Sequence, residues 1–134
     1  MEENIKDPEN LNVVYLAYIG DAIFDLFTRD LLIKNHISKV KMNELHKMNT
    51  DIVCAKSQAR IIERLIDDNV LSDEEIDFYR HARNAHPHSK SKNSSIVDYR
   101  KATGFEALLG LLYYREDKNR LDTLLDKVKG YLLK

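Results

Sequence analysis

A helix predicted over residues 11–34 carries an acidic residue in the middle of an otherwise apolar surface. Its apolar residues cover most of the helix circumference: Val13, Val14, Leu16, Ile19, Ile23, Phe24, Leu26, Phe27, Leu31 and Leu32. A helix of this kind is usually buried at the centre of its domain. Asp21 lies halfway along it, and a buried carboxylate is costly unless it is paired, hydrogen-bonded or bound to a metal. The sequence therefore predicts that another part of the chain supplies a partner for Asp21.

The composition fits a single all-α domain over residues 1–134. A chain of 134 residues is long enough for one core, and its 43% hydrophobic and 32% charged residues are ordinary for a globular protein. Four glycines and two prolines are few for a β-rich fold, which needs more turns. There is no apolar run of membrane length, no apolar segment after Met1 and only one cysteine, so we expect a cytoplasmic protein without disulfides.

Apolar spacing and helix start and stop signals predict five further helices. They are expected over residues 38–48, 51–68, 73–85, 96–114 and 118–133, with a possible break at residues 49–51. Ser72 and Glu75 predict a capping box at the start of the fourth helix. Asp7 and Pro8 mark either the start of the first helix or a short turn leading into it. Cys54 is expected to be a packed small side chain.

The net charge of −1 conceals an uneven distribution. Residues 63–77 contain seven acids and one arginine, which predicts a solvated acidic surface. Residues 80–101 contain six Lys or Arg, one Asp and three histidines. The stretch 86–95 within it lacks apolar residues apart from proline and is rich in turn formers, so we expect an exposed loop. His86 and His88 have no third ligand nearby, and exposed polar residues are expected there instead of a metal site.

A second acidic residue, Glu106, lies in another apolar helix. Gly104 and Gly110 beside it lower helix propensity but permit another helix to approach closely. The economical explanation for two such acids is that Asp21 and Glu106 face each other and share a cation. Carboxylate oxygens completed by water and substrate phosphate are the ligands that Mg²⁺ prefers. The alternative is that each acid is satisfied by a nearby Lys, Arg or helix end.

Both acidic segments resemble the catalytic motifs of the ribonuclease III family. Residues 16–22, Leu-Ala-Tyr-Ile-Gly-Asp-Ala, are similar to its signature helix, and residues 105–110, Phe-Glu-Ala-Leu-Leu-Gly, to its second catalytic helix. The resemblance implies an all-α helical bundle like the ribonuclease III catalytic domain. The short chain, the Arg-Asn-Ala segment at 83–85 and the expected lack of a double-stranded-RNA-binding domain resemble the small Mini-III branch of that family.

Two acidic positions of the family pattern are not acidic in this chain. Ala17 stands where standard ribonuclease III has a glutamate, and Thr103 stands where it has an aspartate. These positions share helix faces with Asp21 and Glu106, so their loss should weaken metal binding and leave more of the coordination shell to water. Thr103 is a candidate for a water-mediated contact with the metal. Asp25 is expected to face solvent or to form a salt bridge.

The resemblance implies a Mg²⁺-dependent endoribonuclease that cleaves double-stranded RNA and leaves 5′-phosphate and 3′-hydroxyl ends. It also implies a role in maturation of large-subunit (23S) ribosomal RNA and a two-fold homodimer whose two sites cut both strands. Asp21 and Glu106 would be the catalytic residues and the metal ligands. Phosphate and sugar contacts to RNA would come from the basic segment, through Arg83, Asn84, Lys90, Lys92, Arg100 and Lys101.

The first helix is also a candidate dimer interface. Its aromatic residues Tyr15, Tyr18, Phe24 and Phe27 exceed what one small core needs, although core packing is the alternative for most of them. A second hypothesis for the whole chain is a non-catalytic helical module of the same fold that binds RNA or dimerises. The two lost acids favour this module. The two retained acids favour the enzyme, because an inactive relative would gain stability by replacing them.

Overall fold

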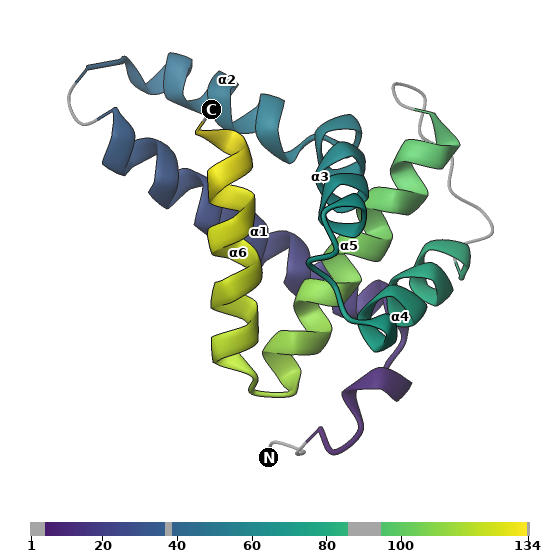
Figure 1. Ribbon diagram of the computed structural model, residues 1–134. Coiled ribbons are helices and arrows are strands. Elements are labelled where there is room, and N and C mark those ends of the chain that lie inside the picture. The colour runs from purple at the N-terminus through teal and green to yellow at the C-terminus, as the bar shows by residue number, and fades with distance from the viewer. Residues whose placement is uncertain (1–4, 37–38, 86–94, 134) are drawn as a thin grey trace.

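The computed structural model describes residues 5–36, 39–85 and 95–133, and the regular secondary structure in these ranges is entirely helical (Figure 1). A short 3-10 turn, η1 (Pro8–Asn10), precedes six helices: α1 (Val13–Asn35), α2 (Met42–Val53), α3 (Ala55–Asp67), α4 (Asp73–Asn84), α5 (Ile96–Tyr114) and α6 (Lys118–Leu132). The all-α fold predicted from the sequence is confirmed. None of the described helices has the length and apolar content needed to cross a lipid bilayer.

The crossing of α1 and α5 forms the centre of the bundle, and two glycines bring the helix backbones into contact there (Figure 1). A Cβ atom added at Gly20 would lie 1.7 Å from the carbonyl oxygen of Glu106. One added at Gly110 would lie 2.1 Å from the carbonyl oxygen of Leu16, which confirms the close approach predicted there. The crossing therefore places the helical turn that carries Asp21 directly beside Glu106.

Side chains from five helices form the main core around this crossing. Phe24 of α1 and Phe105 of α5 are fully buried and pack edge to face, with ring centroids 5.3 Å apart. Helices α3 and α6 complete the cluster with Ile62, Leu65, Leu124 and Val128. Helix α4 joins through Tyr79, whose ring lies 2.7 Å from where a Cβ at Gly104 would be. Phe24 is therefore a core residue. For this residue, core packing is correct and the dimer interface is not.

The break between α2 and α3 lies at Cys54, later than the break considered at residues 49–51. Asn49 is buried and bonds to α1, because its Nδ2 donates to Asp25 Oδ1 (2.7 Å) and its Oδ1 accepts from Thr28 Oγ1 (2.6 Å). Its side chain therefore does not replace the backbone hydrogen bonds of its own helix, and α2 continues past it. Asp25 also pairs with Arg29, as expected. Cys54 is exposed, so the prediction that it packs is wrong.

Side-chain caps set the starts of α1 and α4, as the side chains of Ser95 and Asp117 do for α5 and α6. The Asn12 side chain accepts a hydrogen bond from the Val14 N–H (2.9 Å) and starts α1, so Pro8 belongs to the separate turn η1. Ser72 and Glu75 form the predicted capping box at the start of α4. Each cap satisfies backbone N–H groups that have no partner within the helix, and so fixes where the helix begins.

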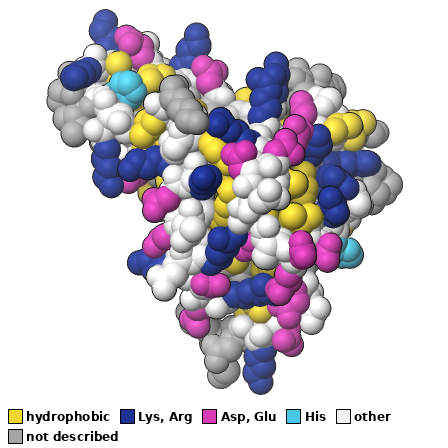
Figure 2. All heavy atoms as spheres, in the orientation of Figure 1, with side chains coloured by type: hydrophobic (Ala, Val, Ile, Leu, Met, Phe, Trp, Pro, Cys, Tyr) yellow, Lys and Arg dark blue, Asp and Glu magenta, His cyan; other side chains and the backbone are white. Residues whose placement is uncertain are grey.

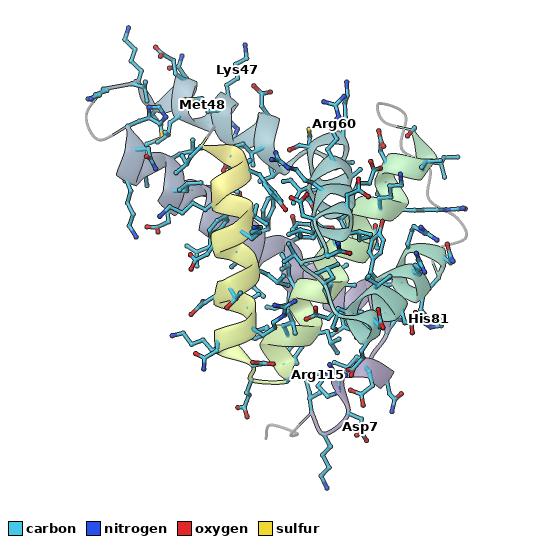
Figure 3. All side chains as sticks on the ribbon, viewed as in Figure 1. Asp7, Lys47, Met48, Arg60, His81 and Arg115 are labelled. Atoms are coloured by element: carbon cyan, nitrogen blue, oxygen red, sulfur yellow. The ribbon has the colours of Figure 1, made fainter. Side chains whose placement is uncertain are left out.

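Ion pairs join the ends of several helices, and the surface around them carries charges of both signs (Figure 2). Glu75 is buried and accepts two hydrogen bonds from Arg120 of α6 (2.8 and 2.6 Å), so it does not belong to the solvated acidic surface that was predicted. Arg115, at the end of α5, lies beside η1 (Figure 3) and pairs with Glu9 (3.6 Å) and Glu74 (2.8 Å). Elsewhere on the face in Figure 2, acidic and basic side chains are interspersed.

Replacing Gly20 by alanine should destabilise the protein by about 1–3 kcal/mol or more, because the added Cβ would overlap a carbonyl oxygen that cannot rotate away. Gly130→Ala is the matched control, since nothing lies within 4 Å of a Cβ at Gly130. That change should stabilise the protein by about 0.5–1 kcal/mol through helix propensity. Urea unfolding measures both variants. A Gly20→Ala protein as stable as the unchanged chain would contradict the close crossing.

Candidate active site

One surface hollow of about 310 Å³ brings the two acidic segments together. Asp21 from α1 and Glu106 from α5 both line it, and the corner between α2 and α3 forms another wall. Ala17 and Thr103, the two positions where acids were noted as missing, line the same hollow. The four positions identified from the sequence therefore converge at one place.

The two carboxylates have different surroundings. Asp21 is exposed, so it is not the buried acid that the apolar helix predicted. The reason is that this side of α1 is uncovered, as Tyr18 beside Asp21 is 81% exposed. Burial, a hydrogen bond with Asp21 and the negative charge of Asp21 raise the pKa of Glu106 to about 8, partly opposed by a hydrogen bond from Gln58. The pair is close enough to share a proton.

A buried glutamine is the third polar group beside the carboxylates. Gln58 of α3 is 2% exposed, and its Nε2 donates to Glu106 Oε2 (3.2 Å) and to the carbonyl oxygen of Val53 (2.8 Å). It was not among the residues singled out from the sequence, although a signal was present. Gln58 falls on the apolar stripe that Ala59 and Ile62 share, where an amide needs an explanation as much as an acid does.

The donor atoms of the hollow suit a hard divalent cation. Two carboxylates in contact repel each other when both are ionised, and a cation relieves this as a shared proton does. Thr103 is buried and donates its Oγ1 hydrogen to the Tyr99 carbonyl (3.0 Å), so it retains only acceptor capacity. In the described part of the chain, no three His, Cys, Asp or Glu side chains are placed to hold a metal together. Asp21 and Glu106 thus suit a divalent cation, most of whose coordination shell they would leave to water.

The basic residues predicted to contact RNA are only partly covered by the structure. Arg83 and Asn84 end α4, where Arg83 Nε donates to Asn84 Oδ1 (3.2 Å) and the Arg83 guanidinium lies 5.7 Å from the ring centroid of Tyr79. On α5, Lys101 pairs with Glu63 of α3, and Arg100 is half-buried. Lys90 and Lys92, the other two residues predicted to contact RNA, lie outside the described ranges, as do His86 and His88, where exposed polar residues were expected.

Comparison with known proteins identifies the group to which this chain is related. Residues 15–117 match the family model described as the Ribonuclease III domain. The chain belongs to the ribonuclease III family. It therefore belongs to a family of endoribonucleases and has their fold, as the two sequence motifs indicated.

Similar members of the ribonuclease III family include the protein named Mini-ribonuclease 3 in three bacteria. The Enterococcus faecalis protein is 39% identical over 91% of both chains. The Staphylococcus aureus protein is 41% identical over 88% of this chain and 87% of its own length, and the Streptococcus pneumoniae protein is 38% identical over 92% and 98%. A crystal structure of a Fusobacterium nucleatum protein matches with a TM-score of 0.78 at 25% identity, covering 92% of this chain and 96% of that one.

The raised pKa of Glu106 predicts how stability depends on pH without metal. Between the ordinary pKa of 4.5 and the folded value of about 8, the folded protein binds a proton that the unfolded chain has released. The melting temperature should therefore fall as pH rises through this range. Calorimetry in excess chelator measures this, and Glu106→Gln should flatten the slope. A metal-free melting temperature that rises steadily from pH 5 to 8 in the unchanged protein, but not in Glu106→Gln, would contradict the carboxylate contact.

Proposed function

We propose that this member of the ribonuclease III family is a Mg²⁺-dependent endoribonuclease that cleaves double-stranded RNA, with Asp21 and Glu106 as its metal ligands. The observation that carries the proposal is the meeting of these two carboxylates in one surface hollow. Similarity to the Mini-ribonuclease 3 proteins supports the same activity. We further propose that its substrate is a precursor of large-subunit ribosomal RNA and that it acts in the cytoplasm.

The small volume of the hollow favours cleavage of an RNA strand that lies across the protein surface. A hollow of about 310 Å³ is too small for an RNA duplex, so only one phosphodiester of the strand approaches the carboxylates. Mg²⁺, when bound, supplies charge neutralisation at that phosphate and activation of the attacking water. Asp21 on the exposed side and Glu106 on the buried side fix where the ion would sit. The products leave with 5′-phosphate and 3′-hydroxyl ends.

The basic residues around the α4–α5 connection complete the RNA-binding surface in this proposal. A-form RNA is recognised mainly by its shape, its phosphates and its 2′-hydroxyls, which suits cationic and amide side chains. Arg83 and Asn84 end α4 and Arg100 and Lys101 lie in α5, so the residues flank the connection from both sides. Lys90 and Lys92 belong to the connection itself, and we propose that they contact RNA because of their charge alone.

We also propose a two-fold homodimer formed through α1. Leu26 is 71% exposed and lines an apolar hollow of about 740 Å³ between α1 and the α5–α6 corner. Tyr15 and Tyr18 are 67% and 81% exposed on the same helix, whereas Phe27 is half-buried at the edge of the core. Exposed apolar area of this kind marks an association surface, and isologous contact of one helix with its copy gives two-fold symmetry.

Asp21→Asn and Glu106→Gln should each reduce cleavage of a long RNA duplex by about 10³-fold or more, because each removes a charged ligand of the catalytic ion. Asp25→Asn is the control, since this acid lies one turn further along α1 and bonds to Asn49 and Arg29. Gel analysis of end-labelled duplex, with Mg²⁺ or with chelator, measures the rate. Full activity of Asp21→Asn would refute the mechanism.

The same assay separates the enzyme from the alternative function. The absence of acids at Ala17 and Thr103 favours a non-catalytic RNA-binding module, because among the described residues the hollow has two carboxylates. A protein that shifts the duplex in a gel but never cleaves it with Mg²⁺ present would establish that module. A large-subunit precursor transcript cut at one position, beside an uncut small-subunit transcript, would support the proposed substrate.

Leu26→Glu should convert the dimer into a monomer, because a carboxylate buried without a partner in an apolar interface is strongly unfavourable. The mass measured by light scattering after size exclusion should fall from twice the chain mass of 15.6 kDa to that mass itself. Met42→Glu is the control, since Met42 is 76% exposed on α2 and lies outside the hollow. An unchanged dimer in Leu26→Glu would place the interface elsewhere.

A further inference from the structure

Gln58 has a hydrogen-bonding atom without a partner beside the two carboxylates. Its Nε2 is fully used, by the carbonyl oxygen of Val53 at 2.8 Å and by Glu106 Oε2 at 3.2 Å. Its Oε1 is buried and has no hydrogen-bond partner among the residues that the structure covers. Buried polar atoms are nearly always satisfied in proteins, so this oxygen indicates a partner that residues 5–36, 39–85 and 95–133 do not provide.

The carbonyl of Val53 fixes which way the Gln58 amide faces. A backbone carbonyl only accepts hydrogen bonds, so the NH₂ group of Gln58 must face it. The reversed amide would set oxygen against oxygen at Val53, and again at Glu106 once that acid is ionised. The unpaired atom is therefore an oxygen, which is the ligand atom that Mg²⁺ prefers.

We infer that Gln58 is part of the metal site, where Nε2 holds the Glu106 carboxylate and Oε1 supplies a third, neutral oxygen to the cation. This inference rests on the function proposed above. Ala17 and Thr103 line the same hollow and offer no carboxylate. The Gln58 amide would supply one of the oxygen ligands that acids at positions 17 and 103 would otherwise give. It adds no negative charge beside Asp21 and Glu106.

The position of Gln58 is set by the corner between α2 and α3. The carbonyl of Val53 is among the last of α2, where backbone oxygens have no partner within the helix. Gln58 lies in the first turns of α3 and satisfies that oxygen across the extended residue Cys54. The amide is therefore anchored at both ends of the corner before a cation arrives, as groups that orient metal ligands usually are.

Mn²⁺ binding to the full chain without RNA tests this role independently of catalysis. Titration followed by the electron paramagnetic resonance signal of free Mn²⁺ gives the dissociation constant. Gln58→Met keeps the side-chain volume but removes both hydrogen-bonding groups, and should raise that constant about 10–100-fold. Gln58→Leu removes the same groups with a smaller side chain that cannot overfill the corner, and should raise the constant to a similar extent.

Asn49→Ala is the matched control, because Asn49 is also a buried amide but bonds to Thr28 and Asp25 away from the hollow. It should lower the melting temperature and leave Mn²⁺ affinity unchanged. A folded Gln58→Met protein with unchanged affinity would overturn the inference. If Gln58→Met does not fold, Gln58→Leu decides alone, and unchanged Mn²⁺ affinity in that variant overturns the inference.

Asp21→Asn separates a failure of this inference from a failure of the proposed function. If the unchanged protein binds no Mn²⁺, or if Asp21→Asn binds it equally well, the metal site itself is wrong and both proposals fall. If Asp21→Asn loses Mn²⁺ while Gln58→Met retains it fully, only the role of Gln58 is wrong. Loss in both variants, with normal binding in Asn49→Ala, supports the inference.

Discussion

The contact between the backbones of α1 and α5 is the constraint on which both the fold and the site depend. Gly20 has no side chain where the carbonyl oxygen of Glu106 passes, so the helices approach more closely than any other residue would permit. Asp21 follows Gly20 directly, and this approach brings its carboxylate to that of Glu106. A packing requirement at one glycine therefore sets the separation of the two acids that we propose as metal ligands.

Stability and chemistry oppose each other at this crossing. Holding Glu106 in a buried position beside a second acid is unfavourable once both are ionised, as its raised pKa indicates. The surrounding apolar contacts, led by the buried Phe24–Phe105 pair, offset that cost without touching the carboxylates. The proposed metal site would use this arrangement, since a divalent cation would relieve the repulsion between the two ionised carboxylates.

The sequence predicted features whose evidence lies within one helix and paired Asp21 with Glu106 because both acids are unusual, but it missed individual side-chain bonds between helices. Asp21 and Glu106 were found because an acid in an apolar helix is visible from periodicity alone. Periodicity does not distinguish an apolar face that is buried from one left exposed, so Asp21 was wrongly placed in the interior. The end of α2 and the role of Gln58 depend on bonds from Asn49 to Asp25 and from Gln58 to Glu106, which no local pattern records.

Asp21 is more exposed than Glu106, so the site has a solvent-facing side and an inner side. In the proposed site, the solvent-facing carboxylate of Asp21 would meet an arriving ion first, and Glu106 would become a ligand only once part of the hydration shell is lost. Ion and water would then exchange through the side of the hollow that Asp21 faces. An RNA strand seated over that side would close this route, so the proposed ion would have to bind before the strand.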